Sequence, residues 1–293
     1  MVEPLRIATR GSELALWQAR HVAGLLGEAC ELVIVDTAAD HRLDIPIWTM
    51  GGKGVFVKEV QAAVLDGRAD LAVHSGKDLP SLTHDDLAIA AVPERGDPRD
   101  ALVGAPLRQL RPGATVATGS LRRRAQLADI RPDLTFAGLR GNMATRLAKA
   151  DDFDAIVVAA VALERLGLGG AIAEILEPEV LVPQVAQGAL AVECRSGDER
   201  TVEALAAIEH APSRRAVDAE RGFLAELGGD CDLPAGAHAV VGPDGSLSLE
   251  GLLASADGHT VLRHRQVGVE PEALGRAVAS YLLDHGGAGL LER

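Results

Sequence analysis

IATRGS (residues 7–12) and VATGS (residues 116–120) are two similar stretches that decide the predicted fold of this 293-residue chain. Each is typical of a strand that ends in a glycine turn, followed by a serine placed to cap a helix. A second pair, ADLAV (residues 69–73) and DAIVV (residues 154–158), repeats the similarity. We therefore predict two similar α/β domains that face each other across a cleft, with helix N-termini available to bind anions. The repeats are short, so chance similarity is the alternative.

Apolar segments alternate with helical patterns through the first two-thirds of the chain. Strands are predicted at residues 5–9, 32–35 and 70–73, with helices over 13–26 and around 56–64. This βαβ alternation predicts mainly parallel sheets with helices on both faces.

The pattern changes after residue 212. A predicted helix over 217–227 precedes three short strands joined by turns at 243–245 and 256–258, and a helix over 271–284 closes the chain. This third part is predicted to be a small α+β domain with an antiparallel sheet. Crossings between the first two domains are expected at 93–98 and 183–188.

Composition narrows the class of protein. The net charge of −13 opposes non-specific attraction to nucleic acid or anionic membranes, and 2% aromatic residues offer few platforms for stacked bases. The first six residues lack an apolar signal core, and the longest apolar run, 155–163, is too short to span a bilayer. Three cysteines lie far apart without metal-type spacing. We expect a cytoplasmic enzyme or binding protein.

Positive charge is concentrated in one segment of this acidic chain. Residues 118–149 hold seven basic side chains against two acidic ones. Arginine grips carboxylates and phosphates in two-pronged fashion, so we predict a site for a small molecule with several negative groups. Helix geometry allows two of the three consecutive arginines to face a cleft, and we assign Arg122 and Arg123. Arg140 and Arg146 lie outside this run and are expected to converge on it; a solvated basic face is the alternative.

HSGKDLP (residues 74–80) follows a buried strand and ends at a proline. It is therefore predicted to be a loop at the carboxyl end of a strand, where open α/β sheets place ligands. Lys77 can bind an anion or form a Schiff base, and Asp78 can act as general acid–base or stabilise a cation. The structural alternatives are a turn-capping role for Asp78 and a hydrogen-bonded role for His74.

Two further loops carry candidate residues. Gly51, Gly52 and Lys53 belong to a glycine-rich loop that lacks the remaining P-loop residues, so a mobile lid or anion cradle suits it better than a nucleotide site. Cys231 lies between two aspartates, which disfavour a standing thiolate but do not prevent attack on a strong electrophile. Its surroundings have no metal-site signature, and no metal is predicted.

Together these motifs resemble the porphobilinogen deaminase (hydroxymethylbilane synthase) family. The match runs in one order through residues 5–10, 14–19, 51–54, 56–59, 74–80, 94–100, 119–123, 139–146, 187–189 and 193–195. The resemblance implies a cytoplasmic, monomeric transferase of tetrapyrrole (haem) biosynthesis. It would join four porphobilinogen molecules head to tail onto a dipyrromethane cofactor, thioether-linked to Cys231, and release hydroxymethylbilane by hydrolysis. Neither nucleic acid nor membrane is an implied partner.

The resemblance also implies an architecture. Two periplasmic-binding-protein-like (type II) α/β domains would enclose a cleft, and a small C-terminal α+β domain with a three-stranded antiparallel sheet would carry Cys231. The corresponding division is domain 1 at 1–95 with 188–210, domain 2 at 96–187, and domain 3 at 211–293.

Roles for individual residues follow from the same resemblance. Asp78 would be catalytic, stabilising the azafulvenium cation formed when ammonia leaves. Carboxylates of cofactor and substrate would be bound by Arg10, Ser12, Lys77, Ser120, Arg122, Arg123, Arg140 and Arg146. Gly51, Gly52, Lys53 and Gln187 would belong to a lid or hinge. The sequence departs from the family pattern at Ala39, Ala186 and Asp230, and the departure at Ala186 predicts a stiffer hinge.

Three rival functions remain. A periplasmic-type receptor or sensor domain for a carboxylate explains paired α/β domains and arginines but gives Cys231 no role. A Schiff-base enzyme built on Lys77 is the second. Nucleic-acid binding through the arginine run is the weakest, given the acidic chain and scarce aromatics.

Overall fold

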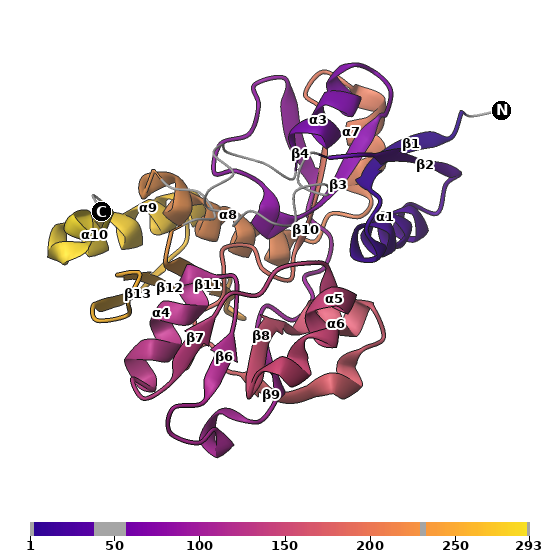
Figure 1. Ribbon diagram of the computed structural model, residues 1–293. Coiled ribbons are helices and arrows are strands. Elements are labelled where there is room, and N and C mark those ends of the chain that lie inside the picture. The colour runs from indigo at the N-terminus through magenta and orange to yellow at the C-terminus, as the bar shows by residue number, and fades with distance from the viewer. Residues whose placement is uncertain (1–2, 38–56, 229–232, 292–293) are drawn as a thin grey trace.

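The computed structural model describes residues 3–37, 57–228 and 233–291, and Figure 1 shows them as three lobes, each with its own sheet. The first sheet has the order β2-β1-β3-β10-β4. Its strands are β1 (Leu5–Arg10), β2 (Cys30–Val35), β3 (Leu71–Ser75), β4 (Leu87–Ala91) and β10 (Leu190–Arg195). Its helices are α1 (Glu13–Leu26), α3 (Lys58–Leu65) and α7 (Glu199–Ala206).

The second sheet repeats this arrangement with the order β7-β6-β8-β5-β9. Its strands are β5 (Asp100–Gly104), β6 (Thr115–Ala117), β7 (Thr135–Ala137), β8 (Ala155–Ala159) and β9 (Ile172–Leu176). Its helices are α4 (Leu121–Ile130), α5 (Met143–Ala148) and α6 (Ala160–Arg165). In both sheets one strand runs parallel to two neighbours, β1 in the first and β6 in the second. The fold-class prediction of two similar α/β units is confirmed.

The prediction of mainly parallel sheets is wrong. β10 runs antiparallel to β3 and β4, and β5 runs antiparallel to β8 and β9, so half of the strand pairings in each sheet are antiparallel. Both strands follow directly after a segment that crosses between the first two lobes. A parallel strand needs a crossover connection that brings the chain back to the end of the sheet where the neighbouring strand begins. β5 and β10 lack such a connection, so each runs in the opposite direction to its neighbours.

Helices cover both faces of the sheets, as predicted from the apolar pattern. In β3, Leu71 and Val73 pack against α1, whereas Ala72 packs against α3 on the other face. Ser12 and Ser120 cap α1 and α4 by accepting backbone N–H hydrogen bonds of 3.4 Å. Both predicted caps are confirmed, and they satisfy amide donors that a helix start leaves without partners.

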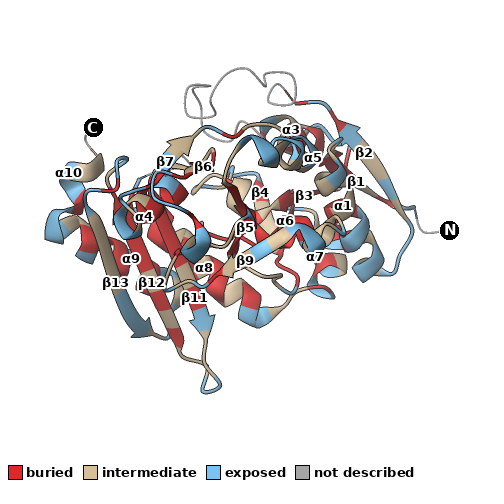
Figure 2. Cartoon of the chain, turned by 60° about the horizontal axis from the view of Figure 1, so that its bottom comes forward, coloured by how far each residue is buried: buried red, intermediate tan, exposed pale blue. Residues whose placement is uncertain are grey.

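The third lobe is an antiparallel sheet covered by two helices. Its elements are α8 (Ala211–Glu226), β11 (Ala235–Val241), β12 (Leu247–Ala254), β13 (Val261–Gly268), α9 (Pro271–Leu282) and α10 (Ala288–Leu291). Gly245 and Gly258 lie in the two predicted turns with φ of 80° and 79°, which glycine adopts at no steric cost. α8 begins earlier than predicted because proline is tolerated in the first turn of a helix. Figure 2 shows the buried residues gathered between this sheet and α8 and α9.

A buried carboxylate fastens the third lobe to both crossing segments. Glu220 of α8 is fully buried and accepts from the guanidinium of Arg95 at 2.7 and 3.0 Å. It also accepts from the backbone N–H groups of Ala186 (2.7 Å) and Ala239 (2.9 Å). One side chain therefore joins the first crossing, the second crossing and β11.

Ala186 has an unusual backbone conformation. Its φ is 56°, and among the described residues no other non-glycine residue has a positive φ. Left-handed backbone costs a non-glycine residue about 1–2 kcal/mol. The glycine typical of the family would remove this cost, so the departure at Ala186 stores strain in the crossing segment.

Within the described residues, no helix combines the length and apolar character needed to cross a membrane.

Candidate functional site

A group of partly buried cations lies where the first two lobes meet. Lys77 and Asp78 form a short helical turn at the carboxyl end of β3, and Arg123 and Arg146 reach them from α4 and α5. Burial lowers the pKa of Lys77 to about 8; the charges of Arg123 and Arg146 add to this effect, while Asp78 and Asp100 oppose it. Four chain segments far apart in sequence therefore share one electrostatic site.

Arg146 and Arg140 extend this site. Burial, then the charges of Arg123 and Arg140, lower the pKa of Arg146 to about 10, with Asp78 offsetting part of the effect. Burial also lowers the pKa of Arg140. The Arg146 Nε donates to the Gly141 carbonyl at 2.8 Å, which fixes the side chain at the start of α5. Cations that depress one another's pKa are stabilised by an anion placed among them, so this site suits a ligand with several carboxylates.

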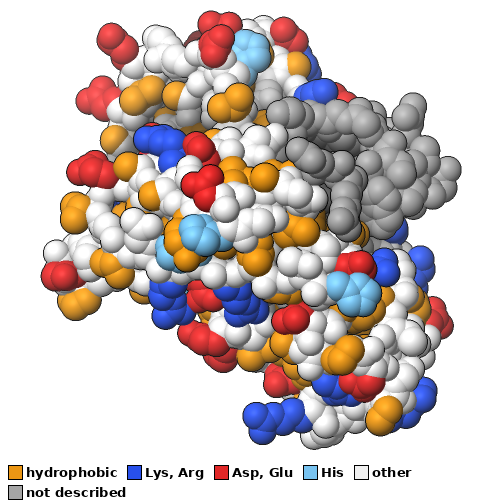
Figure 3. Space-filling model, turned by 90° about the vertical axis from the view of Figure 1, so that its left-hand side faces the viewer, with side chains coloured by type: hydrophobic (Ala, Val, Ile, Leu, Met, Phe, Trp, Pro, Cys, Tyr) orange, Lys and Arg blue, Asp and Glu red, His pale blue; other side chains and the backbone are white. Residues whose placement is uncertain are grey.

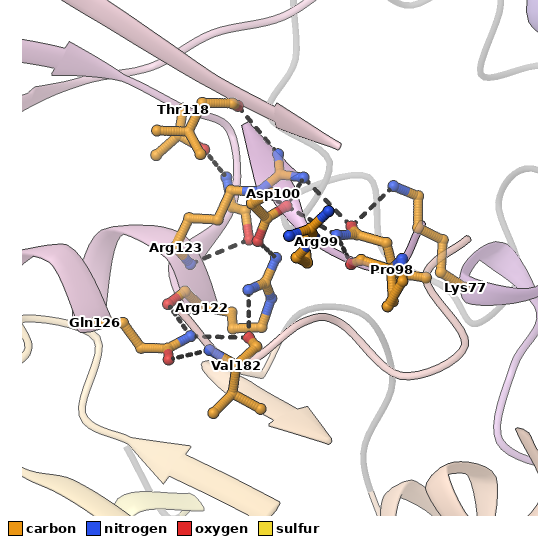
Figure 4. Close-up of polar contacts among 12 residues, drawn as sticks. Lys77, Pro98, Arg99, Asp100, Thr118, Arg122, Arg123, Gln126 and Val182 are labelled. Carbon is orange, nitrogen blue, oxygen red and sulfur yellow. Dashed lines mark hydrogen bonds and ion pairs between the residues drawn. The ribbon is translucent and has the colours of Figure 1, made fainter. Parts of the chain in front are cut away.

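Asp100 is the main internal counter-charge, and Figure 4 shows it between Arg122 and Arg123. Its Oδ2 accepts from Arg122 Nη2 at 2.8 Å, and its Oδ1 accepts from Arg123 Nε and Nη2 at 3.0 and 2.7 Å. Burial alone would raise the pKa of Asp100, but the two arginine charges and a hydrogen bond from Gln187 hold it well below its usual range. Asp100 therefore stays ionised.

The prediction that Arg122 and Arg123 face inward while Arg124 is exposed is confirmed. Arg122 also donates through Nη1 to the Val182 carbonyl at 2.5 Å, and Gln126 binds the Val182 backbone beside it. These contacts tie α4 to the segment before the second crossing and favour a structural role for Arg122. Its role in binding a ligand carboxylate stays a prediction.

Gln187, predicted to belong to a hinge, connects the two lobes through one amide. Its Nε2 donates to the Pro98 carbonyl at 2.7 Å and to Asp100 Oδ1 at 2.9 Å. Its Oε1 accepts from Lys77 Nζ at 3.3 Å and Arg123 Nη2 at 3.4 Å. A ligand that draws Lys77 away would therefore act directly on the crossing segments.

A cavity of about 60 Å³ adjoins the cations on the side of the first lobe. Its polar lining brings together Arg10, Ser12, Gln18, His74, Ser75 and Asp78. Gln18 Nε2 donates to Ser75 Oγ at 2.8 Å. Among the described residues, none donates a hydrogen bond to the half-buried carboxylate of Asp78. Asp78 thus lines the cavity and also contributes charge to the cation group, and it joins the two parts of the site.

The structure places most predicted site residues in these two groups. Arg10, Ser12 and Asp78 line the cavity, while Lys77, Arg123, Arg140 and Arg146 share the cation group. Ser120 caps α4 next to Arg123. Gly51, Gly52, Lys53 and Cys231 lie outside the described residues. In the part of the chain that the structure describes, no group of His, Cys, Asp or Glu is arranged to hold a metal ion.

Sequence reasoning missed several residues of the site. Asp100 and Gln18 stand inside matched motifs, but nothing in their spacing showed which side chains they would meet. Arg165 carried no signal at all. Its guanidinium donates to the Gly188 carbonyl at 2.7 Å and lies 5.3 Å from the ring centre of Trp17, and burial lowers its pKa to about 10. This contact links α6 to α1 across the two lobes.

Arg122 and Arg123 of the basic segment are buried, whereas Arg124 and Lys149 are exposed. Figure 3, which looks onto the side of the molecule that carries α9 and α10, shows acidic and basic side chains interspersed with hydrophobic ones. A mixed face of this kind does not single out a charged partner, whereas the cation group does.

Two family models match the chain. "Porphobilinogen deaminase, dipyromethane cofactor binding domain" matches residues 5–203, and "Porphobilinogen deaminase, C-terminal domain" matches residues 215–284. A porphobilinogen deaminase of Nitratidesulfovibrio vulgaris is 44% identical over 99% of this chain and 96% of its own length. A porphobilinogen deaminase of Roseiflexus is 47% identical over 99% of this chain and 99% of its own length.

Solved structures show a weaker likeness. The GluR0 ligand-binding core of Nostoc punctiforme is 14% identical, covering 70% of this chain and 91% of its own, with a TM-score of 0.35. This similarity is too low to support a conclusion about fold or function.

Proposed function

The chain belongs to the porphobilinogen deaminase family, and on that premise we propose that it is a hydroxymethylbilane synthase. This transferase deaminates four porphobilinogen molecules, joins them head to tail onto a covalently bound dipyrromethane primer, and releases linear hydroxymethylbilane by hydrolysis. The observation that carries the proposal is the site itself: partly buried cations that depress one another's pKa, beside a carboxylate in a cavity.

The cation group fits a polypyrrole that carries several carboxylates. The matched cofactor-binding region, residues 5–203, contains all of its members. Lys77, Arg123, Arg140 and Arg146 would bind acetate and propionate groups, and each bound carboxylate relieves the repulsion among them. When bound, the dipyrromethane cofactor supplies the primer onto which pyrroles are joined. Cys231, which falls within the matched C-terminal domain but outside the described residues, would hold it through a thioether.

Asp78 would stabilise the cation formed when ammonia leaves porphobilinogen. Its carboxylate lines the cavity beside Arg10 and Ser12, which would hold carboxylates of the incoming substrate. The negative charge would oppose the positive charge that develops on the pyrrole. Charge stabilisation at the reacting centre accelerates the step only where the transition state gains more than the ground state, and here the charge develops during the reaction.

Further properties belong to the same proposal. The enzyme would be a cytoplasmic monomer that needs neither nucleic acid nor membrane. The division into domain 1 (1–95 with 188–210), domain 2 (96–187) and domain 3 (211–293) is supported by the three sheets and by β10 joining the first of them.

The proposal is tested by the mass of the purified protein. Expressed where porphobilinogen is available, it should exceed the 30.5 kDa of the bare polypeptide by one cofactor and convert porphobilinogen to hydroxymethylbilane. Peptide mapping should find the adduct on the peptide containing Cys231, with Cys30 and Cys194 unmodified. A protein of bare mass that binds carboxylates without turnover would instead support the receptor alternative.

The pKa of Lys77 predicts how activity depends on pH. Lys77 loses its positive charge as pH rises through about 8, so carboxylate binding weakens and kcat/KM, which reports ionisations of the free enzyme, should fall above that pH. Lys77→Arg keeps its charge and should show a flatter profile between pH 7.5 and 9.5. Identical profiles would exclude Lys77 as the titrating group. Turnover by Lys77→Arg would also dismiss the Schiff-base alternative, because arginine cannot form that bond.

A further inference from the structure

A third buried carboxylate, Glu193 of β10, contacts His74, a residue that lines the cavity. It is fully buried, and His74 Nε2 is 3.0 Å from its Oε2. Gln61 Nε2 donates to both carboxylate oxygens, at 2.9 and 3.2 Å. His74 pairs with Ala191 in the antiparallel register, so Glu193 stands two residues along β10, on the same sheet face that α3 covers.

The elements whose residues surround Glu193 also contribute residues to the cavity or contact the segment that follows it. His74 lies four residues before Asp78 and lines the same cavity. Gln61 belongs to α3, and this helix also contributes Val60 to the cavity lining. Arg221 comes from α8, whose chain continues toward Cys231, and it donates to the Ser81 carbonyl and Thr83 Oγ1 at 3.2 and 3.4 Å. Glu193 therefore contacts β3 through His74 and α3 through Gln61, and the charge of Arg221 on α8 acts on it.

The electrostatics show that Glu193 is held as an anion. Burial alone would raise its pKa, but the close contact with His74, a hydrogen bond from Gln61 and the charge of Arg221 lower it below the usual range. A buried charge with fixed partners tolerates little displacement, because each shift leaves a polar group without compensation. His74 and Gln61, which contact Glu193, are therefore held in fixed positions.

We propose that Glu193 is a positioning residue, whose carboxylate fixes β3 and α3 relative to one another and thereby holds Asp78 in place in the cavity. The inference rests on the proposed function of the site. Glu193 itself is separated from the cavity by His74 and does not line it, so it would act through that side chain and not on the substrate.

Glu193→Gln tests this, because it keeps the shape and removes the charge. Misplacing a reacting group by about 1 Å costs about 100-fold, so we expect kcat to fall about 10- to 100-fold. KM should change little, because Arg10, Ser12 and the cation group remain. Gln61→Met, which removes one partner at similar volume, should lower kcat less and covers the case in which Glu193→Gln does not fold.

Asp70→Asn is the matched control. Asp70 directly precedes β3 and pairs with Arg6 at 2.7 Å, at the end of the strand away from the cavity. It should lower the midpoint of urea unfolding without lowering kcat. If both variants lose stability and kcat in proportion, Glu193 is merely structural and the inference fails.

A double-mutant cycle supplies the second readout. If His74 and Glu193 act as one unit, Glu193→Gln combined with His74→Asn should cost no more in kcat than the worse single change. Additive losses, or a Glu193→Gln kcat equal to that of the parent, would overturn the inference. The parent is assayed for adduct and turnover in the same series, and failure there would instead contradict the proposed function.

Discussion

Asp78→Asn should lower kcat about a thousandfold while leaving the fold and the covalent adduct intact. A carboxylate about 4 Å from a unit positive charge contributes about 4 kcal/mol at an effective dielectric constant near 20, which corresponds to roughly that factor in rate. Asparagine has the same shape but no charge, so the cavity lined by Arg10 and Ser12 should survive. Loss should therefore appear in kcat and not in KM.

The measurement is single-turnover deamination of porphobilinogen by the purified variant, with its intact mass as a check on the adduct. Asp86→Asn is the control, because this carboxylate lies in the same stretch of chain but its side chain is 80% exposed and outside the cavity. It should match the parent. If Asp78→Asn retained more than about a tenth of the parent rate, the charge of Asp78 would contribute too little to be catalytic.

Local sequence patterns were sufficient for the parts of the fold that depend on neighbouring residues. Ser12 and Ser120 were placed as helix caps because a cap acts within three residues of its partner. The angle between consecutive helical residues showed that only two of the three arginines could face inward, and the assignment of Arg122 and Arg123 agrees with their burial. Both features are set within one turn of helix, and the structure confirms both.

Features that depend on distant contacts could not be predicted in this way. The antiparallel course of β10 depends on where the chain re-enters the first sheet, and its own residues do not reveal this. Asp100 meets Arg122, Arg123 and Gln187 across separations of 22, 23 and 87 residues. A single sequence shows an aspartate in a matched motif, but its partners become evident only when the lobes are assembled.

Asp100→Asn should lower the free energy of unfolding more than removal of any single charge in the cation group. Arg122 donates to Oδ2, while Arg123 and Gln187 donate to Oδ1. An asparagine amide would face one of these donors with its own N–H groups in either orientation. Removing one member of a buried ion pair costs about 3–5 kcal/mol, because the remaining charge stays buried without compensation. Urea unfolding at pH 7 should show a loss of this size.

The pH dependence gives an independent check on that loss. Asp100 has a folded-state pKa held well below its usual range, so its stabilisation is present above the unfolded-state value of about 3.9 and is lost as pH falls from there toward the folded-state value. The parent's advantage over Asp100→Asn should therefore be constant near neutral pH and shrink below about pH 4. An advantage that did not change with acid would show that shape, and not charge, sets the effect.

Asp133→Asn is the control for Asp100→Asn, because it removes the same charge from an arginine pair that is more exposed. Arg131 binds Asp133 in two-pronged fashion at 2.7 and 2.6 Å, but the two side chains are 23% and 36% exposed. Water and salt screen an exposed pair, so its loss should leave the unfolding midpoint almost unchanged. If both variants lost the same free energy of unfolding, burial would not strengthen the ion pairs of Asp100. The cations that the site presents to a carboxylate ligand would then not depend on Asp100 for their placement.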